Sequence, residues 1–187
     1  MPLAPSQPLL PGLANASDQL LANGATVVSL SLPDSPRVCL DFWCRAGSVF
    51  ESAAESGMAH CLEHMVFKGS QSLDAGEFDL KVEALGGNSN AATGFDDVHY
   101  HVLMPPEAAP QALELLLDLV LQPRLDGDDF AMERQVVLEE LAQSEDQPDE
   151  MAFQQLLKLG CGDHAYGQPI LGQKEALLAH QPGAMAQ

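Results

Sequence analysis

Four stretches of the chain have the composition or the alternation of β-strands: residues 25–32, 37–46, 90–93 and 98–104. In the second stretch alternate residues from Val38 to Cys44 are apolar, and they share one side because successive side chains of a strand point to opposite faces. The prolines of residues 33–36 indicate a turn that joins the first two strands. The last two stretches are predicted to pair with each other.

Helical patterns, with apolar residues three or four positions apart, cover residues 57–68, 73–85, 107–121, 128–144 and 148–159. Ser56 is the expected N-cap of the first helix, which Gly69 ends. Asp74 begins the second helix, and Gly86 and Gly87 close it. Strands and helices in this order predict an α+β fold. We expect a two-layer α/β sandwich in which helices cover one face of a mostly antiparallel sheet.

The first predicted helix carries the pentapeptide His60-Cys61-Leu62-Glu63-His64. On a helix His60 and His64 point within about 40° of each other, and Glu63 lies about 60° to the other side of His60. Two neutral imidazoles in this geometry can hold zinc, and a nearby free carboxylate can take a proton from water. The order His-x-x-Glu-His is the inverzincin signature. The alternative is a helix with two histidines that are solvated or satisfied in the core.

A zinc site with an open position usually takes a third protein ligand. The candidates are Glu133 and Glu140, which are seven residues apart and therefore lie on the same face of a helix. Two carboxylates on an otherwise apolar face are costly unless something compensates them. One of them would bind the metal and the other would support a ligand. The alternative is that both lie at a rim and pair with Arg124 or Arg134.

Four segments in order resemble the motifs of the pitrilysin/insulinase metallopeptidases, which include the mitochondrial processing peptidases: residues 60–69, 86–93, 133–140 and 164–172. The resemblance implies that fold and the activity of a zinc-dependent endopeptidase, with one Zn²⁺ per domain. By the family pattern His60, His64 and Glu140 are the metal ligands, and Glu133 is the supporting acid. Glu63 is then the general base of peptide hydrolysis.

The resemblance also places an edge strand at Asn90, Ala91, Ala92 and Thr93. We expect the peptide or unfolded-protein substrate to add there as a further strand, held by backbone hydrogen bonds. The alternative is an ordinary edge strand. His99 and His101 share one face of the next strand. They are either a second metal site or solvent-facing histidines.

Family members carry a second, homologous α/β half, covalent or in a separate subunit. We therefore expect residues 1–20 to be a loose lead-in and residues 21–187 to be the N-terminal domain of a zinc metallopeptidase, truncated before its last strands. Two alternatives stay open for this part of the fold. One is a non-catalytic assembly subunit, and the other is a zinc-binding fragment that cleaves nothing without its second half.

The 187 residues include 27 acidic and 8 basic side chains, for a formal charge of −19. This balance argues against nucleic acid or an anionic membrane as partner, because both need clusters of Lys and Arg. It suits cationic peptides, or it serves solubility alone. Residues 1–20 contain no positively charged side chain and fit neither a secretory signal nor a transit peptide. We therefore predict a cytoplasmic protein.

Overall fold

The computed structural model describes residues 16–185, which fall into two compact units divided between residues 36 and 37. In the first unit, β1 (Ala16–Leu20) and β2 (Thr26–Leu30) form an antiparallel hairpin. Its turn is closed by two hydrogen bonds, in which the N–H of Leu21 donates to the Ala25 carbonyl and the N–H of Gly24 to the Leu21 carbonyl. Because this turn is local and short, it pairs β2 with the strand before it.

The hairpin corrects two expectations drawn from the sequence. Residues 16–20 form a strand inside the stretch that we expected to be loose, while residues 1–15 lie outside the described part of the chain. The strand predicted at residues 25–32 pairs with β1 rather than with the strand that follows residues 33–36. The prolines mark the boundary between the two units instead of a hairpin turn.

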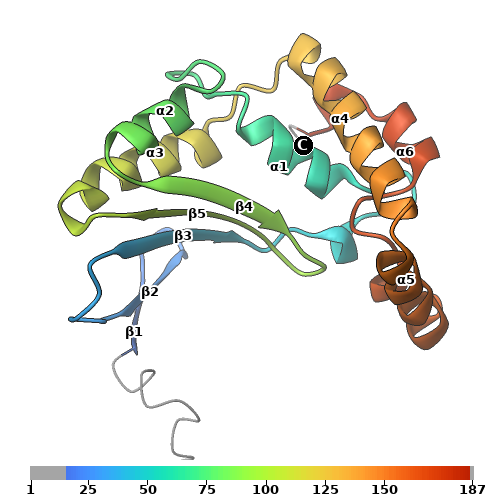
Figure 1. Cartoon of the computed structure of the whole chain (residues 1–187), viewed down its shortest axis with the longest axis horizontal. Coiled ribbons are helices and arrows are strands. Elements are labelled where there is room, and N and C mark those ends of the chain that lie inside the picture. Colours follow the sequence, from blue (N-terminus) through green and yellow to red (C-terminus); the bar gives the residue numbers. More distant parts are fainter. Residues whose placement is uncertain (1–15, 186–187) are drawn as a thin grey trace, which may run out of the picture. The chain divides into compact units, whose positions relative to one another are not determined.

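The second unit contains a three-stranded antiparallel sheet in the order β3-β5-β4 (Figure 1). Its strands are β3 (Val38–Cys44), β4 (Asn88–Thr93) and β5 (Val98–Met104). The order leaves β4 at one edge of the sheet. The predicted α+β architecture is confirmed, because helices cover one face of an antiparallel sheet.

One face of the sheet is buried under helices α2 (Glu77–Ala84) and α3 (Ala109–Leu121). Every second residue of β5 belongs to this core: Val98, Tyr100, Val102 and Met104. The helices contribute Phe78, Val82, Leu116 and Leu119. The intervening residues of β5, among them His99 and His101, therefore point to the other face.

Helix α1 (Met58–Val66) is capped from a distance and not by Ser56. Its N-cap is Gly57, which has a φ of 84° and no capping side chain of its own. The Glu51 carboxylate accepts the N–H groups of Gly57 at 2.8 Å and Ala59 at 2.7 Å. Burial raises the pKa of Glu51, although these N–H groups favour its ionised form. A residue outside the helical pattern thus does what we predicted for Ser56.

Helix α2 begins later than predicted, at Glu77 rather than at Asp74. The N–H of Glu77 donates to the Asp74 carbonyl and the Glu77 carboxylate accepts the N–H of Asp74, so these residues form a separate turn. Gly76 then adopts a φ of 76° and redirects the chain into the helix. The predicted closure is confirmed, because Gly86 follows the helix with a φ of 80°.

The remaining helices are α4 (Gly127–Glu145), α5 (Pro148–Cys161) and α6 (Lys174–Ala179). A second buried cluster of Cys61, Val137, Leu141 and Leu177 joins α1, α4 and α6. This cluster sets the position of α4 beside α1. None of the helices within residues 16–185 is both long enough and apolar enough to cross a bilayer.

The chain beyond α5 returns to the start of α1 through a close approach of two glycines. Gly172 has a φ of 86°, and a Cβ added there would lie 2.6 Å from both the Gly57 Cα and the Ser56 carbonyl oxygen. Only a residue without a side chain fits this position. The approach holds the segment before α6 against the helix that carries the two histidines.

We expect Gly172→Ala to destabilise the second unit by about 3 kcal/mol, from the left-handed φ and the clash with backbone together. Gly76→Ala is the matched control, because Gly76 has a φ of 76° but no atom within 4 Å of an added Cβ. The control should lose only about 1–2 kcal/mol. Urea unfolding of both variants measures the difference, and equal losses would show that the close approach adds nothing.

Candidate metal centre

His60 and His64 lie one helical turn apart on α1, and both rings face Glu140 of α4. Figure 1 shows α1 beside α4. His60 is buried, with 9% of its surface exposed, and His64 is partly buried. The two ring centroids are 4.7 Å apart with the planes at 73°. The spacing predicted from the sequence therefore places both imidazoles at one spot.

Two carboxylates of helix α4, those of Glu133 and Glu140, face these rings. Its buried stripe consists of Phe130, Glu133, Val137, Leu141 and Ser144. Glu140 lies beside this stripe, and its Oε2 is 3.6 Å from His60 Nε2 and 3.4 Å from His64 Nε2. Glu139, the residue before it, is exposed.

The spacing of these atoms fits a metal ion better than hydrogen bonding. Hydrogen bonds of this kind are about 2.7–3.2 Å long. Ligands that surround zinc tetrahedrally at about 2.0–2.1 Å lie about 3.3–3.4 Å from one another. Ligand atoms of His60, His64 and Glu140 all lie within 4.8 Å of each other. Two imidazoles and one carboxylate suit zinc in particular.

The protonation states also suit a metal ligand set. Burial, and then the neighbouring His64, lower the pKa of His60 to about 4, so the ring is neutral near pH 7. Its buried Nδ1 has no hydrogen-bond partner among the described residues. Burial raises the pKa of Cys61 to about 12, which keeps this residue a neutral thiol. Cys61 belongs to the core between the helices.

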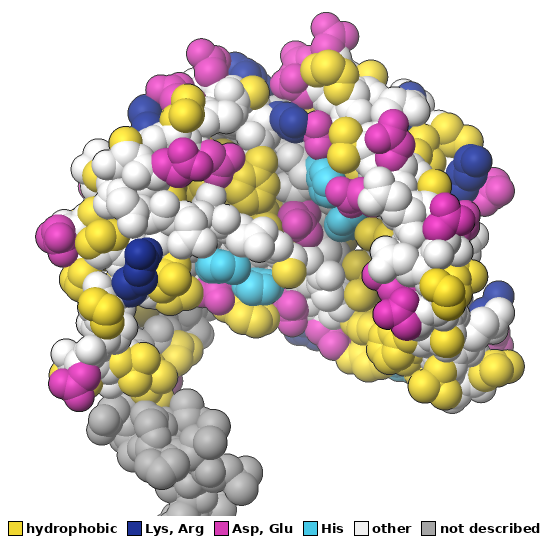
Figure 2. Space-filling view, in the orientation of Figure 1, with side chains coloured by type: hydrophobic (Ala, Val, Ile, Leu, Met, Phe, Trp, Pro, Cys, Tyr) yellow, Lys and Arg dark blue, Asp and Glu magenta, His cyan; other side chains and the backbone are white. Residues whose placement is uncertain are grey.

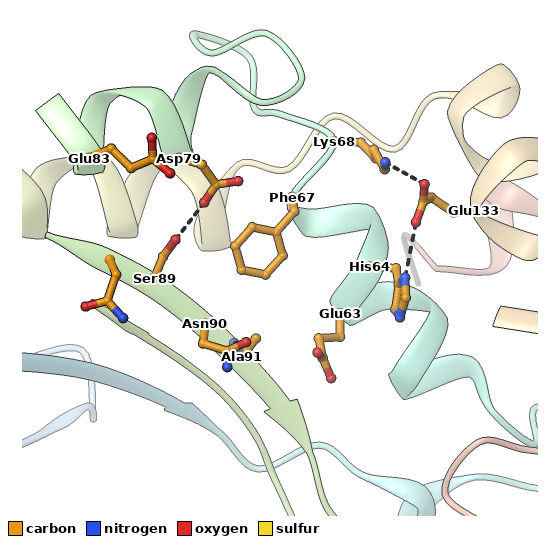
Figure 3. A pocket seen from close by; sticks show the side chains of 11 residues that line it. Glu63, His64, Phe67, Lys68, Asp79, Glu83, Ser89, Asn90, Ala91 and Glu133 are labelled. Atoms are coloured by element: carbon orange, nitrogen blue, oxygen red, sulfur yellow. Dashed lines mark hydrogen bonds and ion pairs between the residues drawn. The ribbon is translucent and has the colours of Figure 1, made fainter. Parts of the chain in front are cut away.

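Glu133 links the second histidine to a lysine (Figure 3). Its carboxylate accepts a hydrogen bond from His64 Nδ1 at 3.1 Å and pairs with Lys68 Nζ at 2.5 Å. With the proton on Nδ1, the lone pair of His64 Nε2 faces Glu140. Glu133 thus fixes the orientation and the tautomer of the ring.

The alternative prediction, that Glu133 and Glu140 pair with Arg124 or Arg134, is wrong: within the described residues both arginines have other partners. Arg124 pairs with Asp74 at 3.2 Å, and Arg134 donates to the carbonyl groups of Leu178 and His180. We assigned no role to Lys68 from the sequence. Its position four residues after His64 would have placed it on the histidine face of the helix.

Glu63 lies on α1 opposite the edge strand β4, and its carboxylate accepts a hydrogen bond from the Thr93 hydroxyl. The Thr93 side chain therefore faces the helix. A cavity of about 540 Å³ opens between α1, α2 and β4. Figure 3 shows the side chains that line it: Glu63, His64, Phe67, Lys68, Asp79, Glu83, Asn88, Ser89, Asn90, Ala91 and Glu133.

The predicted strand residues thus differ in their positions. Ala91 and Thr93 point to the helix side of the sheet, while Asn90 and Ala92 alternate with them, and Asn90 borders the cavity from the edge of the strand. The Ala91 N–H donates to the Asn90 side-chain oxygen at 2.9 Å, so it takes no part in the ladder with β5. This N–H lies at the free edge of the sheet.

The sequence model of a family described as Insulinase (Peptidase family M16) matches residues 26–174. An uncharacterised zinc protease of Rickettsia felis is 32% identical over 84% of this chain and 38% of its own length. A solved protease structure from Helicobacter pylori, 31% identical, gives a TM-score of 0.86 over 91% of this chain and 42% of its own. The peptidase M16 inactive domain from Pseudomonas fluorescens, 21% identical, gives 0.82 over 92% and 42%, which shows the fold alone. The chain therefore spans between 38% and 42% of these proteins.

The geometry predicts that Glu140→Gln weakens zinc binding by about 100-fold or more, because it removes the anionic ligand atom. Changes to residues that only support a ligand cost roughly 10–100-fold, and loss of a ligand should cost more. Glu139→Gln, the adjacent and exposed acid, is the matched control and should bind zinc as before. Competition with a chromophoric chelator measures both. Loss of zinc in the Glu139 variant alone would move the ligand to that residue.

Proposed function

The chain belongs to the insulinase family, peptidase family M16, and on this premise we propose that it is the metal-binding part of a zinc-dependent endopeptidase. One observation carries the proposal: Glu140 lies 3.4–3.6 Å from two imidazole nitrogens on another helix. Such a convergence of a carboxylate and two buried or half-buried histidines is costly without an ion to share them.

His60, His64 and Glu140 would hold the ion. When bound, zinc supplies Lewis-acid chemistry, which polarises the scissile carbonyl and makes water more acidic. Glu63 lies on the same helix one residue before His64, and its carboxylate contacts Thr93. Its carboxylate accepts the proton of the attacking water and delivers it to the leaving amine.

Thr93 and Glu133 position these groups. The Thr93 hydroxyl donates to one oxygen of Glu63 and leaves the other oxygen free to accept a proton. Glu133 holds the His64 ring, and its ion pair with Lys68 offsets part of the cost of burying the carboxylate. Both residues act through the groups that they hold.

The substrate is proposed to lie along the free edge of β4, from Asn90 to Thr93. The Ala91 N–H is a donor at this edge, and the Asn90 side chain that occupies it can be displaced by a peptide carbonyl. A peptide here passes beside Glu63 and the cavity. Acids that line the cavity outnumber its one lysine, which favours peptides with basic side chains.

The remaining proposals concern the whole protein. Because the chain spans about two fifths of its relatives, a second homologous half is proposed to complete the substrate chamber, whether in one polypeptide or as a subunit. The assignment of residues 21–187 to an N-terminal metallopeptidase domain and the cytoplasmic location stay predictions. The alternative is a non-catalytic subunit, because the fold also occurs in a protein described as an inactive M16 domain.

We expect Glu63→Gln to retain zinc and to lose peptide hydrolysis by about 10²–10⁴-fold, because the amide cannot accept the proton. A quenched fluorescent peptide measures turnover, alone and with a supplied second half, and elemental analysis measures zinc. Glu55→Gln, an exposed acid just before the helix, serves as control. Unchanged hydrolysis in the Glu63 variant would remove this residue from the mechanism. A chain that binds no zinc would support the non-catalytic subunit.

We expect Glu133→Gln to weaken zinc binding by about 10–100-fold, because the neutral amide holds His64 less firmly and leaves Lys68 without its partner. The double variant Glu133→Gln with Lys68→Met should recover part of this loss, since it removes the unpaired ammonium group as well. The same chelator competition measures both variants. An affinity equal to that of the unchanged chain would show that Glu133 does not tune the ligand.

A further inference from the structure

The exposed face of the sheet carries a cluster of three metal-binding side chains that the proposed function does not use. His99 and His101 lie two residues apart on β5, and both point away from the helices. Asp41 on β3 lies directly opposite His101 in the antiparallel register. Directly opposite residues on neighbouring strands have Cβ atoms about 4.5–5.5 Å apart, so all three side chains reach one spot.

The distances within this cluster suit one ion. Asp41 Oδ1 and His99 Nδ1 are hydrogen-bonded at 3.0 Å, so these two side chains already face each other, and an ion would take the place of the proton between them. Ligand atoms of all three residues lie within 4.8 Å of one another. Two ligand atoms bound to one ion at about 2.1 Å can lie at most about 4.2 Å apart, so the partly exposed side chains would have to rotate slightly to bind together.

A single tryptophan holds the cluster in shape. The Trp43 indole stacks on the His99 ring at 4.4 Å with the planes 13° apart. The His99 and His101 rings are stacked in turn, at 5.7 Å and 18°. The indole therefore limits the rotation of His99, which lowers the entropic cost of ordering this ligand around an ion.

Asn90 flanks the cluster on β4, but its side-chain oxygen already accepts the Ala91 N–H. It lies opposite His101 on β4, so that His101 has Asp41 on one side and Asn90 on the other. The ligand set is therefore two imidazoles and a carboxylate. Imidazole favours copper, nickel and zinc over magnesium and calcium. The negative charge of the chain raises the local concentration of any cation.

We propose that Asp41, His99 and His101 form a second metal site, which binds a divalent first-row transition ion on the exposed face of the sheet. This site is separate from the candidate centre of His60, His64 and Glu140, which lies on the helix side. Figure 2 shows histidine side chains in two separate places on one face of the molecule, some over the sheet and some beside the helices. Metal binding at this site requires no peptidase activity.

Tryptophan fluorescence tests this proposal, because the chain has one tryptophan and it lies against a proposed ligand. An open-shell ion held by His99 quenches the indole beside it. We expect titration of the whole chain with NiCl₂ near pH 7.5 to quench the emission saturably. EDTA should restore the emission, and the closed-shell ion Zn²⁺ should compete with the quenching.

His101→Ala and Asp41→Asn are the decisive variants, because each removes a ligand and leaves the stacked pair of Trp43 and His99 in place. We expect each variant to raise the nickel concentration at the titration midpoint at least about 10-fold, which corresponds to a loss of about 1.4 kcal/mol of binding free energy. His64→Ala, which removes a ligand of the other centre, should leave the midpoint unchanged. Circular dichroism checks that each variant is folded.

Copper electron paramagnetic resonance gives a second, direct measurement. In a His64→Ala background, one equivalent of Cu²⁺ should show hyperfine coupling to two imidazole nitrogens, and a further His101→Ala change should leave one. Quenching that does not saturate, or midpoints equal in the unchanged chain and both decisive variants, would overturn the proposal. Spectra without imidazole coupling would overturn it as well.

Discussion

The candidate metal centre depends on the packing of α1 against α4. Four buried side chains, Cys61, Val137, Leu141 and Leu177, hold the two helices together. This apolar contact brings Glu140 within 3.6 Å of both imidazoles, although the ligands are far apart in the sequence. Hydrophobic burial in the same interface thus offsets the cost of burying the two rings and the Glu133 carboxylate. Loss of that contact would separate the ligands even if every one of them were intact.

The same helix connects the centre to the sheet edge. Glu63 and His64 are neighbours in the chain but face different partners, the Thr93 hydroxyl of β4 and the carboxylates of α4. A bound peptide at the edge and an ion between the helices would therefore meet at one turn of α1. The Glu51 cap and the approach of Gly172 to Gly57 fix the start of this helix.

Much of this arrangement could be predicted from the sequence, because the signals were local and periodic. The geometry of a single element accounts for the alternation in β3 and β5 and for the spacing of His60 and His64. It also accounts for the position of Glu133 and Glu140 on one face of α4. The errors arose where another part of the chain decided the outcome. Ser56 was a reasonable N-cap, but Glu51 reaches the same N–H groups from outside the helix. Residues 25–32 were a strand, but the partner lay in residues 16–20.

By itself the sequence determined the class of fold, the helix that carries the histidines and the set of residue types able to bind zinc. It did so because helical and strand periodicities are properties of short segments. Only the tertiary structure decided that Lys68 supports Glu133, that Thr93 holds Glu63, and that Asp41 joins His99 and His101. Most of these pairs join residues on different elements. For Lys68, the sequence offered several acidic residues as possible partners. Strand register and helix packing set the distances between such residues, and neither can be predicted from the pattern of a short segment.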